Sequence, residues 1–167
     1  MERLFSPWRS EYIESFHKEN GDKTCVFCNA VNENPVDVNS LVVYKGKTVF
    51  IIMNRYPYNN GHLLILPYRH VAKLNELNDA EKTEIFYLLE VSVQALDGAL
   101  NSQGHNIGMN LGKAAGAGIE DHLHFHVVPR WNGDTNFMPV LNDVKLISEE
   151  ILKTKTKLIS FFEGFKK

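Results

Sequence analysis

Long apolar runs, cysteines and strong net charge are all scarce in this chain of 167 residues. Its apolar stretches, such as residues 49–53, fall far short of the roughly 20 residues that cross a bilayer as a helix. The N-terminus, MERLFSPWRSEY, lacks the apolar core of a secretory signal, so we expect a cytoplasmic protein. A formal net charge of −2 argues against binding to nucleic acid polymers or membranes through a basic surface.

The strand-forming stretches are short and separated by turn residues. We also find no internal repeat and no low-complexity segment, and the length suits a single domain over residues 1–167. Gly46 lies between two stretches rich in β-branched and aromatic residues, which predicts a hairpin. The predicted strands are residues 41–45, 48–54, 62–67, 105–112 and 122–130.

Three segments carry helical periodicity. Residues 78–100 form the longest, and Asn78 with Glu81 makes a capping-box pattern at its start. Shorter amphipathic helices are predicted for residues 8–18 and 148–164. Several strands with one long inserted helix and one C-terminal helix are typical of an α+β fold with a mainly antiparallel sheet of about five strands.

The stretch DHLHFHVVPRW, residues 121–131, places three histidines at alternate positions. In a strand, residues two apart point to the same face, so His122, His124 and His126 would share one face. Three adjacent imidazoles are costly as core filler. The pattern indicates a site that handles protons, phosphates or a metal.

A glycine-rich loop, AAGAG at residues 114–118, directly precedes the histidines. Such loops let backbone N–H groups approach a ligand and often cradle phosphates, although a lone glycine-rich loop is usually only a turn. Its position just before the three histidines favours phosphate chemistry.

The chain has only two cysteines, Cys25 and Cys28, in the sequence CVFC. This spacing is typical of a redox pair or of half a metal site, and two unrelated cysteines are the alternative. A redox pair usually follows a strand, which the polar run KENGDKT before Cys25 does not supply.

The motif HLHFHVVPR resembles the signature of the histidine triad family, His-x-His-x-His followed by apolar residues. The stretch NRYPYNNGHLLILPYRH is similar to the family's substrate-pocket strand, and LFSPWRSEY and PRWNGDTNFMPV resemble the branch of bacterial diadenosine tetraphosphate phosphorylases. The resemblance covers roughly residues 4–142. It implies one histidine triad domain with an N-terminal extension over residues 1–35, a core over 36–142 and a C-terminal helix within 143–167.

The resemblance also implies a catalytic set. The middle histidine of the family attacks the α-phosphorus of a nucleotide and forms a nucleotidyl-histidine, and here that residue is His124. His126 takes the family role of hydrogen bonding to phosphate oxygens, and His122 flanks the nucleophile. His62 matches a fourth histidine near the phosphates.

Further residues match the family's substrate contacts. Asn54 stands where the family places a ribose-contacting residue, often an aspartate, and Asn110 matches a polar residue of the phosphate site. Trp131 matches an aromatic residue near the nucleotide. Many family members carry a serine or glutamine in the loop before the triad, whereas this chain offers only backbone N–H groups there. Those loop residues are Gly116, Ala117 and Gly118.

Some bacterial triad proteins bind a structural zinc ion, and the resemblance implies the ligands Cys25, Cys28, His70 and His122 here. Two thiolates and two imidazoles make a good tetrahedral zinc set and neutralise the charge of the ion. Because four protein ligands leave no open position for water, such a zinc would be structural. Reduced, unliganded cysteines are the alternative.

We therefore expect an enzyme that cleaves at the α-phosphate of a nucleotide through a nucleotidyl-histidine. Diadenosine polyphosphates are the leading substrates, by phosphorolysis or hydrolysis. The alternatives are an adenosine phosphoramidate hydrolase and a nucleotide-binding regulatory module with negligible turnover. The resemblance and the apolar face of residues 85–100 also predict a homodimer.

Overall fold

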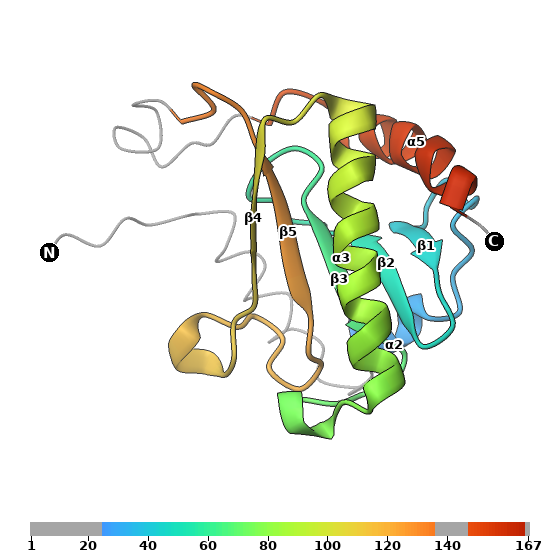
Figure 1. Ribbon diagram of the computed structural model, residues 1–167, viewed down its shortest axis with the longest axis vertical. Coiled ribbons are helices and arrows are strands. Elements are labelled where there is room, and N and C mark those ends of the chain that lie inside the picture. Colours follow the sequence, from blue (N-terminus) through green and yellow to red (C-terminus); the bar gives the residue numbers. More distant parts are fainter. Residues whose placement is uncertain (1–24, 136–146, 166–167) are drawn as a thin grey trace, which may run out of the picture.

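The computed structural model describes residues 25–135 and 147–165, so the predicted helix at 8–18 lies outside the described residues. Five strands form one antiparallel sheet in the order β1-β2-β3-β5-β4 (Figure 1). The strands are β1 Val42–Lys45, β2 Val49–Met53, β3 Leu63–Pro67, β4 Gly104–Gly108 and β5 Phe125–Arg130. The helices are α2 Val26–Ala30, α3 Asp79–Leu100 and α5 Ile151–Phe162, with short 3-10 turns η1 Leu74–Glu76, η2 Lys113–Ala115 and η3 Glu163–Phe165.

This architecture confirms the predicted α+β fold with one long inserted helix and a C-terminal helix. The long helix α3 begins as its sequence predicts, because Asn78 and Glu81 form a reciprocal capping box with both N···O distances at 2.9 Å. The helix ends at Asn101, whose φ of 53° gives the left-handed conformation common after a helix. None of the helices in the described parts of the chain is long and apolar enough to cross a membrane.

The two faces of the sheet bury different partners. The helices α3 and α5 cover one face, and the core there includes Leu63, Leu123 and Val127 (Figure 1). The short helix α2 packs against the other face, where Phe27 and Leu64 belong to a second apolar cluster. His126 on β5 pairs with Leu64 of that second cluster, and Phe27 packs against His124, so the candidate site lies on the α2 side.

The last strand is shorter than the sequence predicts. Its ladder with β3 starts at the pair Ile65 and Phe125, rather than at His122. The chain between His122 and His124 instead turns toward the segment after β3, and the Leu123 N–H donates to the Val71 carbonyl at 2.7 Å. Two of the three histidines therefore lie just outside the sheet.

Candidate active site and adjoining metal centre

Four histidines form a continuous buried row. The ring centroids of His62 and His126 are 5.1 Å apart, and those of His126 and His124 are 5.0 Å apart. His122 lies at the far end of the row. All four are buried, with relative exposures of 0% for His62 and His122, 8% for His124 and 9% for His126. Such burial requires that each ring nitrogen be accounted for by a partner or a ligand.

The hydrogen-bond direction between His62 and His126 follows from a backbone donor. The Tyr58 N–H donates to His62 Nδ1 at 3.1 Å, so this nitrogen carries a lone pair. The proton of neutral His62 is then on Nε2, which donates to His126 Nδ1 at 2.9 Å. His126 in turn carries its proton on Nε2, an atom that is buried and has no hydrogen-bond partner among the described residues. This N–H is therefore free to donate to a bound ligand.

His124 has the opposite tautomer. Its Nδ1 lies 2.8 Å from the backbone carbonyl oxygen of His122, and a carbonyl only accepts, so Nδ1 carries the proton. The lone pair of neutral His124 is then on Nε2. A neutral imidazole with a lone pair on Nε2, next to a buried N–H donor on His126, is suited to attack an electrophilic phosphorus.

Burial keeps the row neutral. Desolvation, followed by the charges on His126 and His124, lowers the pKa of His62 to about 3. Desolvation, followed by the charge on His124, lowers the pKa of His126 to about 4. Burial also lowers the pKa of His124, although its hydrogen bond to the His122 carbonyl opposes the shift. At neutral pH the lone pair of His124 is thus available.

Two residues of the loop before β3, Asn54 and Tyr58, contact the row of histidines. Asn54 places Nδ2 3.3 Å from His62 Nδ1, and its Oδ1 accepts from the Tyr56 N–H at 3.0 Å. The ring of Tyr58 stacks on His126 with centroids 5.7 Å apart and lies tilted against His62 at 4.7 Å, and the residue remains 43% exposed. Asn54 and Tyr58 therefore border the opening to the histidines.

The glycine-rich loop follows β4, whose last residue, Gly108, pairs with His126. Asn110 lies two residues beyond that pair, in the chain leading to the loop. The Gly116 N–H donates to the Lys113 carbonyl at 2.9 Å, and the Ala117 N–H lies 3.3 Å from the Gly112 carbonyl oxygen. Two backbone amides that the sequence offers for phosphate binding are thus engaged within the loop, which continues through Gly118.

Trp131 lies at the other end of β5. It follows His126 by five residues, which corresponds to roughly 16 Å along a strand. Its indole N–H donates to the Asn101 carbonyl at 2.9 Å, beside a separate cavity of 590 Å³. Neighbouring Arg130 is held by Asp134 at 2.6 Å. The structure therefore does not bring Trp131 to the histidine row within this chain.

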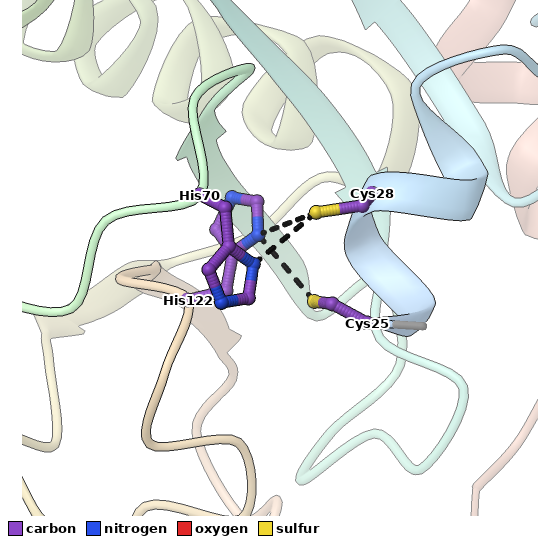
Figure 2. A group of neighbouring side chains, drawn as sticks. All are labelled: Cys25, Cys28, His70 and His122. Carbon is purple, nitrogen blue, oxygen red and sulfur yellow. Dashed lines mark hydrogen bonds between the residues drawn. The ribbon is translucent and has the colours of Figure 1, made fainter. Parts of the chain in front are cut away.

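The fourth member of the row, His122, belongs to a group of metal-type donors. Its Nε2 lies 2.9 Å from the Pro67 carbonyl oxygen, so Nε2 carries the proton and Nδ1 has a lone pair. Nδ1 faces Cys25 Sγ at 3.5 Å and Cys28 Sγ at 3.6 Å, and His70 Nδ1 lies 3.2 Å from Cys28 Sγ (Figure 2). All four donor atoms lie within 4.8 Å of one another.

These distances fit a tetrahedral zinc ion. With usual bond lengths to sulfur and nitrogen, a tetrahedron places its sulfur and nitrogen ligands about 3.5 Å apart. The hydrogen bond from His122 to the Pro67 carbonyl is the kind of support that orients an imidazole toward a metal. Burial and the neighbouring Cys25 raise the pKa of the Cys28 thiol, an effect that a bound cation would offset.

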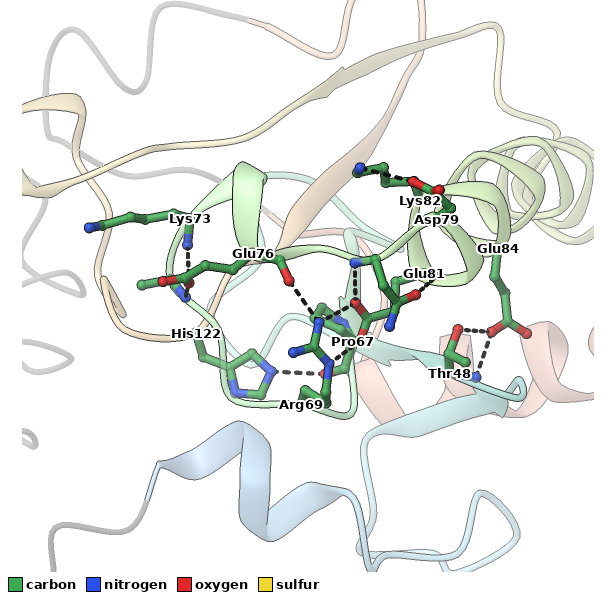
Figure 3. Close-up of polar contacts among 12 residues, drawn as sticks. Thr48, Pro67, Arg69, Lys73, Glu76, Asp79, Glu81, Lys82, Glu84 and His122 are labelled. Atoms are coloured by element: carbon green, nitrogen blue, oxygen red, sulfur yellow. Dashed lines mark hydrogen bonds and ion pairs between the residues drawn. The ribbon is translucent and has the colours of Figure 1, made fainter.

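The segment after β3 is fixed to the start of α3. Arg69 donates to both carboxylate oxygens of Glu81, at 2.7 Å from Nε and 2.6 Å from Nη2 (Figure 3). Glu81 is the residue that also caps the helix, and its side chain is 2% exposed. His70 and the carbonyl of Pro67 thus flank a residue, Arg69, that is anchored to the start of α3.

Two residues at the site carry no motif that would have singled them out. Phe27, between the two cysteines, packs against His122 at 5.5 Å and His124 at 5.1 Å. Tyr58 fixes the tautomer of His62 through its backbone N–H. Phe27 lies within CVFC and Tyr58 lies in the stretch before GHLLILP, but aromatic residues are far more often part of the core.

Comparison with known proteins agrees with this geometry. The HIT domain family model matches residues 36–133. A protein named AP-4-A phosphorylase from Mycobacterium tuberculosis is 36% identical over 161 residues, which are 95% of this chain and 83% of the relative. An asymmetrical bis(5'-nucleosyl)-tetraphosphatase from Schizosaccharomyces pombe is 29% identical over 125 residues, 75% of this chain and 65% of the relative.

The fold has a close match among solved structures. A Zn-bound histidine triad family protein from Mycobacterium smegmatis superposes with a TM-score of 0.68 and 24% identity, covering 87% of this chain and 97% of that chain. The family model spans more than half of the chain, and the mycobacterial phosphorylase aligns over nearly all of it. The chain therefore belongs to the HIT, or histidine triad, family.

Proposed function

We propose that this protein transfers a nucleotidyl group from a phosphoanhydride to an acceptor through a covalent intermediate on His124. The observation that carries the proposal is the pair of opposite tautomers, a lone pair on His124 Nε2 and a free N–H on His126 Nε2. One atom attacks phosphorus, and the other donates to a phosphate oxygen. The curated relatives are nucleotide-processing enzymes, and the chain is an enzyme of this class.

In the first step the lone pair of His124 Nε2 forms a P–N bond to the α-phosphorus. The P–O bond to the leaving phosphate breaks, and the leaving oxygen takes its electron pair. The His126 N–H stabilises the negative charge that develops on the phosphate oxygens, and His62 holds His126 in the donor tautomer. In the second step an acceptor oxygen attacks phosphorus, the P–N bond breaks, and neutral His124 is restored.

Diadenosine polyphosphates are the leading substrates. The support is the name of the M. tuberculosis relative, an AP-4-A phosphorylase, together with that of the S. pombe tetraphosphatase. Asn54 at the rim of the row would contact the ribose, with an amide in place of a carboxylate. An adenosine phosphoramidate hydrolase would use the same nucleophile with a smaller leaving group.

A product assay separates these activities. The protein is incubated with diadenosine tetraphosphate, with and without orthophosphate, and the products are separated by chromatography. ATP and ADP formed only with phosphate identify phosphorolysis, and ATP and AMP formed without it identify hydrolysis. Absence of turnover on this substrate and on adenosine phosphoramidate, with measurable AMP binding, would contradict the enzymatic proposal and favour a regulatory module.

We also propose that Cys25, Cys28, His70 and His122 hold a zinc ion. The support is the geometry of the four donors, since a thiol–imidazole cluster with lone pairs converging at tetrahedral distances is a good zinc site. A bound zinc ion would join α2 to the segment of His70 and to the segment of His122, which directly precedes the nucleophile. Elemental analysis of the protein purified without added metal should find about one zinc per chain, and a value near zero would contradict the site.

We propose a homodimer in the cytoplasm. Phe86 and Tyr87 project from α3 at 73% and 46% exposure, and Ile107 on the edge strand β4 is 49% exposed. A second copy would cover such apolar surface and an open strand edge. Light scattering should give twice the chain mass of 19.1 kDa, and a value near 19.1 kDa at micromolar concentration would contradict the dimer.

A further inference from the structure

The nucleophile is not held by the sheet. The ladder between β3 and β5 ends at Phe125, so the backbone of His124 lies one residue before the first paired position. A side chain that must present one nitrogen to a phosphorus needs a fixed backbone and a fixed ring. Contacts outside the ladder must therefore fix the backbone and the ring of His124.

Those contacts come from His122 and its neighbour. The His122 carbonyl oxygen accepts from His124 Nδ1 at 2.8 Å and thereby sets the nucleophilic tautomer. His122 itself is fixed by its ring, whose Nε2 bonds to the Pro67 carbonyl. The adjacent Leu123 N–H bonds to the Val71 carbonyl at 2.7 Å. Hence the orientation of His124 depends on how the segment of His122 docks onto the segment after β3.

The Cys₂His₂ cluster spans this docking. His122 comes from one docked segment and His70 from the other, while Cys28 lies in α2 and Cys25 is its N-cap residue (Figure 2). The segment of His70 is anchored on α3 by the ion pair of Arg69 with Glu81 (Figure 3). An ion bound by the four donors would therefore pull the segment of His122 against a rigid support.

A second contact runs through α2. Phe27 lies between the two cysteines and is 6% exposed, and its ring packs 5.1 Å from the ring of His124. Its edge also meets His122 at 5.5 Å. Because α2 is a helix of only five residues, its place on the sheet depends on the buried side chains of Phe27 and Ala30 and on the two cysteines.

We infer that the Cys₂His₂ site is energetically coupled to the nucleophile, with His122 and Phe27 acting as positioning residues for His124. Metal at the cluster and nucleotide at the histidine row stabilise the same arrangement of residues 122–124. The inference rests on the zinc and nucleotide binding proposed above and adds a linkage between them. By reciprocity, each ligand must raise the affinity for the other by the same factor.

The linkage is measured as two affinities on the full-length protein. The zinc dissociation constant is determined by competition with a chromophoric chelator, with and without saturating AMP, and the AMP dissociation constant is determined with and without zinc. Coupling between sites typically amounts to roughly 5-fold to 150-fold. We expect both ratios to exceed about 5 and to agree with each other. Ratios within twofold of one, in protein that binds both ligands, would overturn the inference alone.

Failures of the underlying proposals give different results. A protein that binds AMP but no zinc would overturn the metal site and this inference, while the nucleotidyl transfer would stand. A protein that binds zinc but no AMP would overturn the proposed function and the linkage together.

Two variants separate positioning from general stability. Phe27→Leu keeps all four donors and an apolar side chain, and it should still bind zinc while the coupling ratio falls at least twofold. An unchanged ratio would overturn the role of Phe27. Thr48→Ala removes the hydroxyl bond of 2.5 Å to Glu84 at the β1–β2 turn, away from the site, and should leave the ratio unchanged. A ratio lowered as much by Thr48→Ala as by Phe27→Leu would show that the coupling reflects stability alone.

Discussion

His122 and His126 occupy the two flanks of the nucleophile, and the structure gives them opposite surroundings. His126 lies within β5, where its Nδ1 accepts from another imidazole and its Nε2–H has no partner among the described residues. His122 lies before the strand, where its Nε2–H donates to the Pro67 carbonyl and its Nδ1 faces the sulfur atoms of the two cysteines. The first is set up to donate to an anion, and the second to bind a cation.

The alternate spacing of His122, His124 and His126 in the sequence does not by itself assign a chemical role to each imidazole. The role of each imidazole follows from which of its nitrogens meets an obligatory donor or acceptor of the backbone. A carbonyl on Nδ1 leaves the lone pair of His124 on Nε2, as the proposed nucleophile requires, and a carbonyl on Nε2 leaves the lone pair of His122 on Nδ1, as the proposed zinc ligand requires.

Removing the nucleophile should have the largest effect. His124→Asn should lower turnover by roughly 10⁴-fold to 10⁶-fold, as loss of a residue at the centre of covalent catalysis does in other enzymes. AMP binding should persist, because the flanking histidines remain. Steady-state kinetics and AMP titration measure the two quantities.

A matched control uses a histidine outside the row. His105 is hydrogen-bonded to Ser102 at 3.1 Å, and His105→Asn should keep wild-type turnover. Rapid quenching of wild type with radiolabelled nucleotide should trap acid-labile, base-stable label on His124. Label on any other residue, or an active His124→Asn variant, would remove the assignment.

Disrupting the proposed zinc site should mainly lower the free energy of unfolding. Cys28→Ser should reduce bound zinc from about one per chain to near zero. When free zinc exceeds its dissociation constant by about 1,000-fold, losing the site costs about 4 kcal/mol. Chemical unfolding with zinc present measures this difference. Treating wild type with chelator should reproduce it, and equal stability with and without zinc would rule out a structural metal.

Removing the His126 side chain that would donate to the phosphate should lower kcat. His126→Ala removes the Nε2–H donor, and the loss of one donor to a developing charge costs about 10²-fold to 10³-fold in kcat. Zinc content should remain at the wild-type level, because His126 is not among the four donors. Loss of zinc in this variant would show that His126 also supports the proposed zinc site.

The most gradual effect concerns pH. The unfolded chain protonates His62 near its ordinary pKa of 6.5, whereas the folded chain resists protonation until a pKa of about 3. Stability should therefore decrease as the pH falls below 6.5, by up to about 1.4 kcal/mol per pH unit for each such histidine. His126, with a pKa of about 4, adds to the same slope.

Urea unfolding in the presence of chelator measures this slope without a contribution from metal release. His62→Asn should lower the slope of the unfolding free energy against pH by the contribution of one proton, up to about 1.4 kcal/mol per pH unit. A wild-type stability that does not change between pH 6.5 and pH 4.5 would contradict the buried neutral state of the row.

Much of the fold was predictable because its signals are local. The capping box at Asn78 and Glu81 set the start of α3, and alternation placed Leu123 and Val127 on the core face. The start of β5 was not predictable, because the bonds of His122 and Leu123 to Pro67 and Val71 depend on contacts between segments far apart in sequence.

The site was predictable in composition rather than in geometry. The resemblance supplied the four histidines and both cysteines, but no residue pattern specifies which ring nitrogen faces a carbonyl. The helix α2 escaped prediction because five residues carry too little periodicity. Trp131 is predicted near the nucleotide, and its indole bonds to Asn101 at the far end of β5, so its role stays a prediction.

The most direct test of the account is the tautomer of each histidine, read from ¹⁵N chemical shifts and long-range ¹H–¹⁵N couplings of the zinc-loaded protein near pH 7. We predict the proton on Nδ1 for His124 and on Nε2 for His62, His122 and His126. A proton on Nε2 of His124, or a His126 that is protonated on Nδ1 alone, would leave no nucleophile beside a donor and would contradict the proposed mechanism.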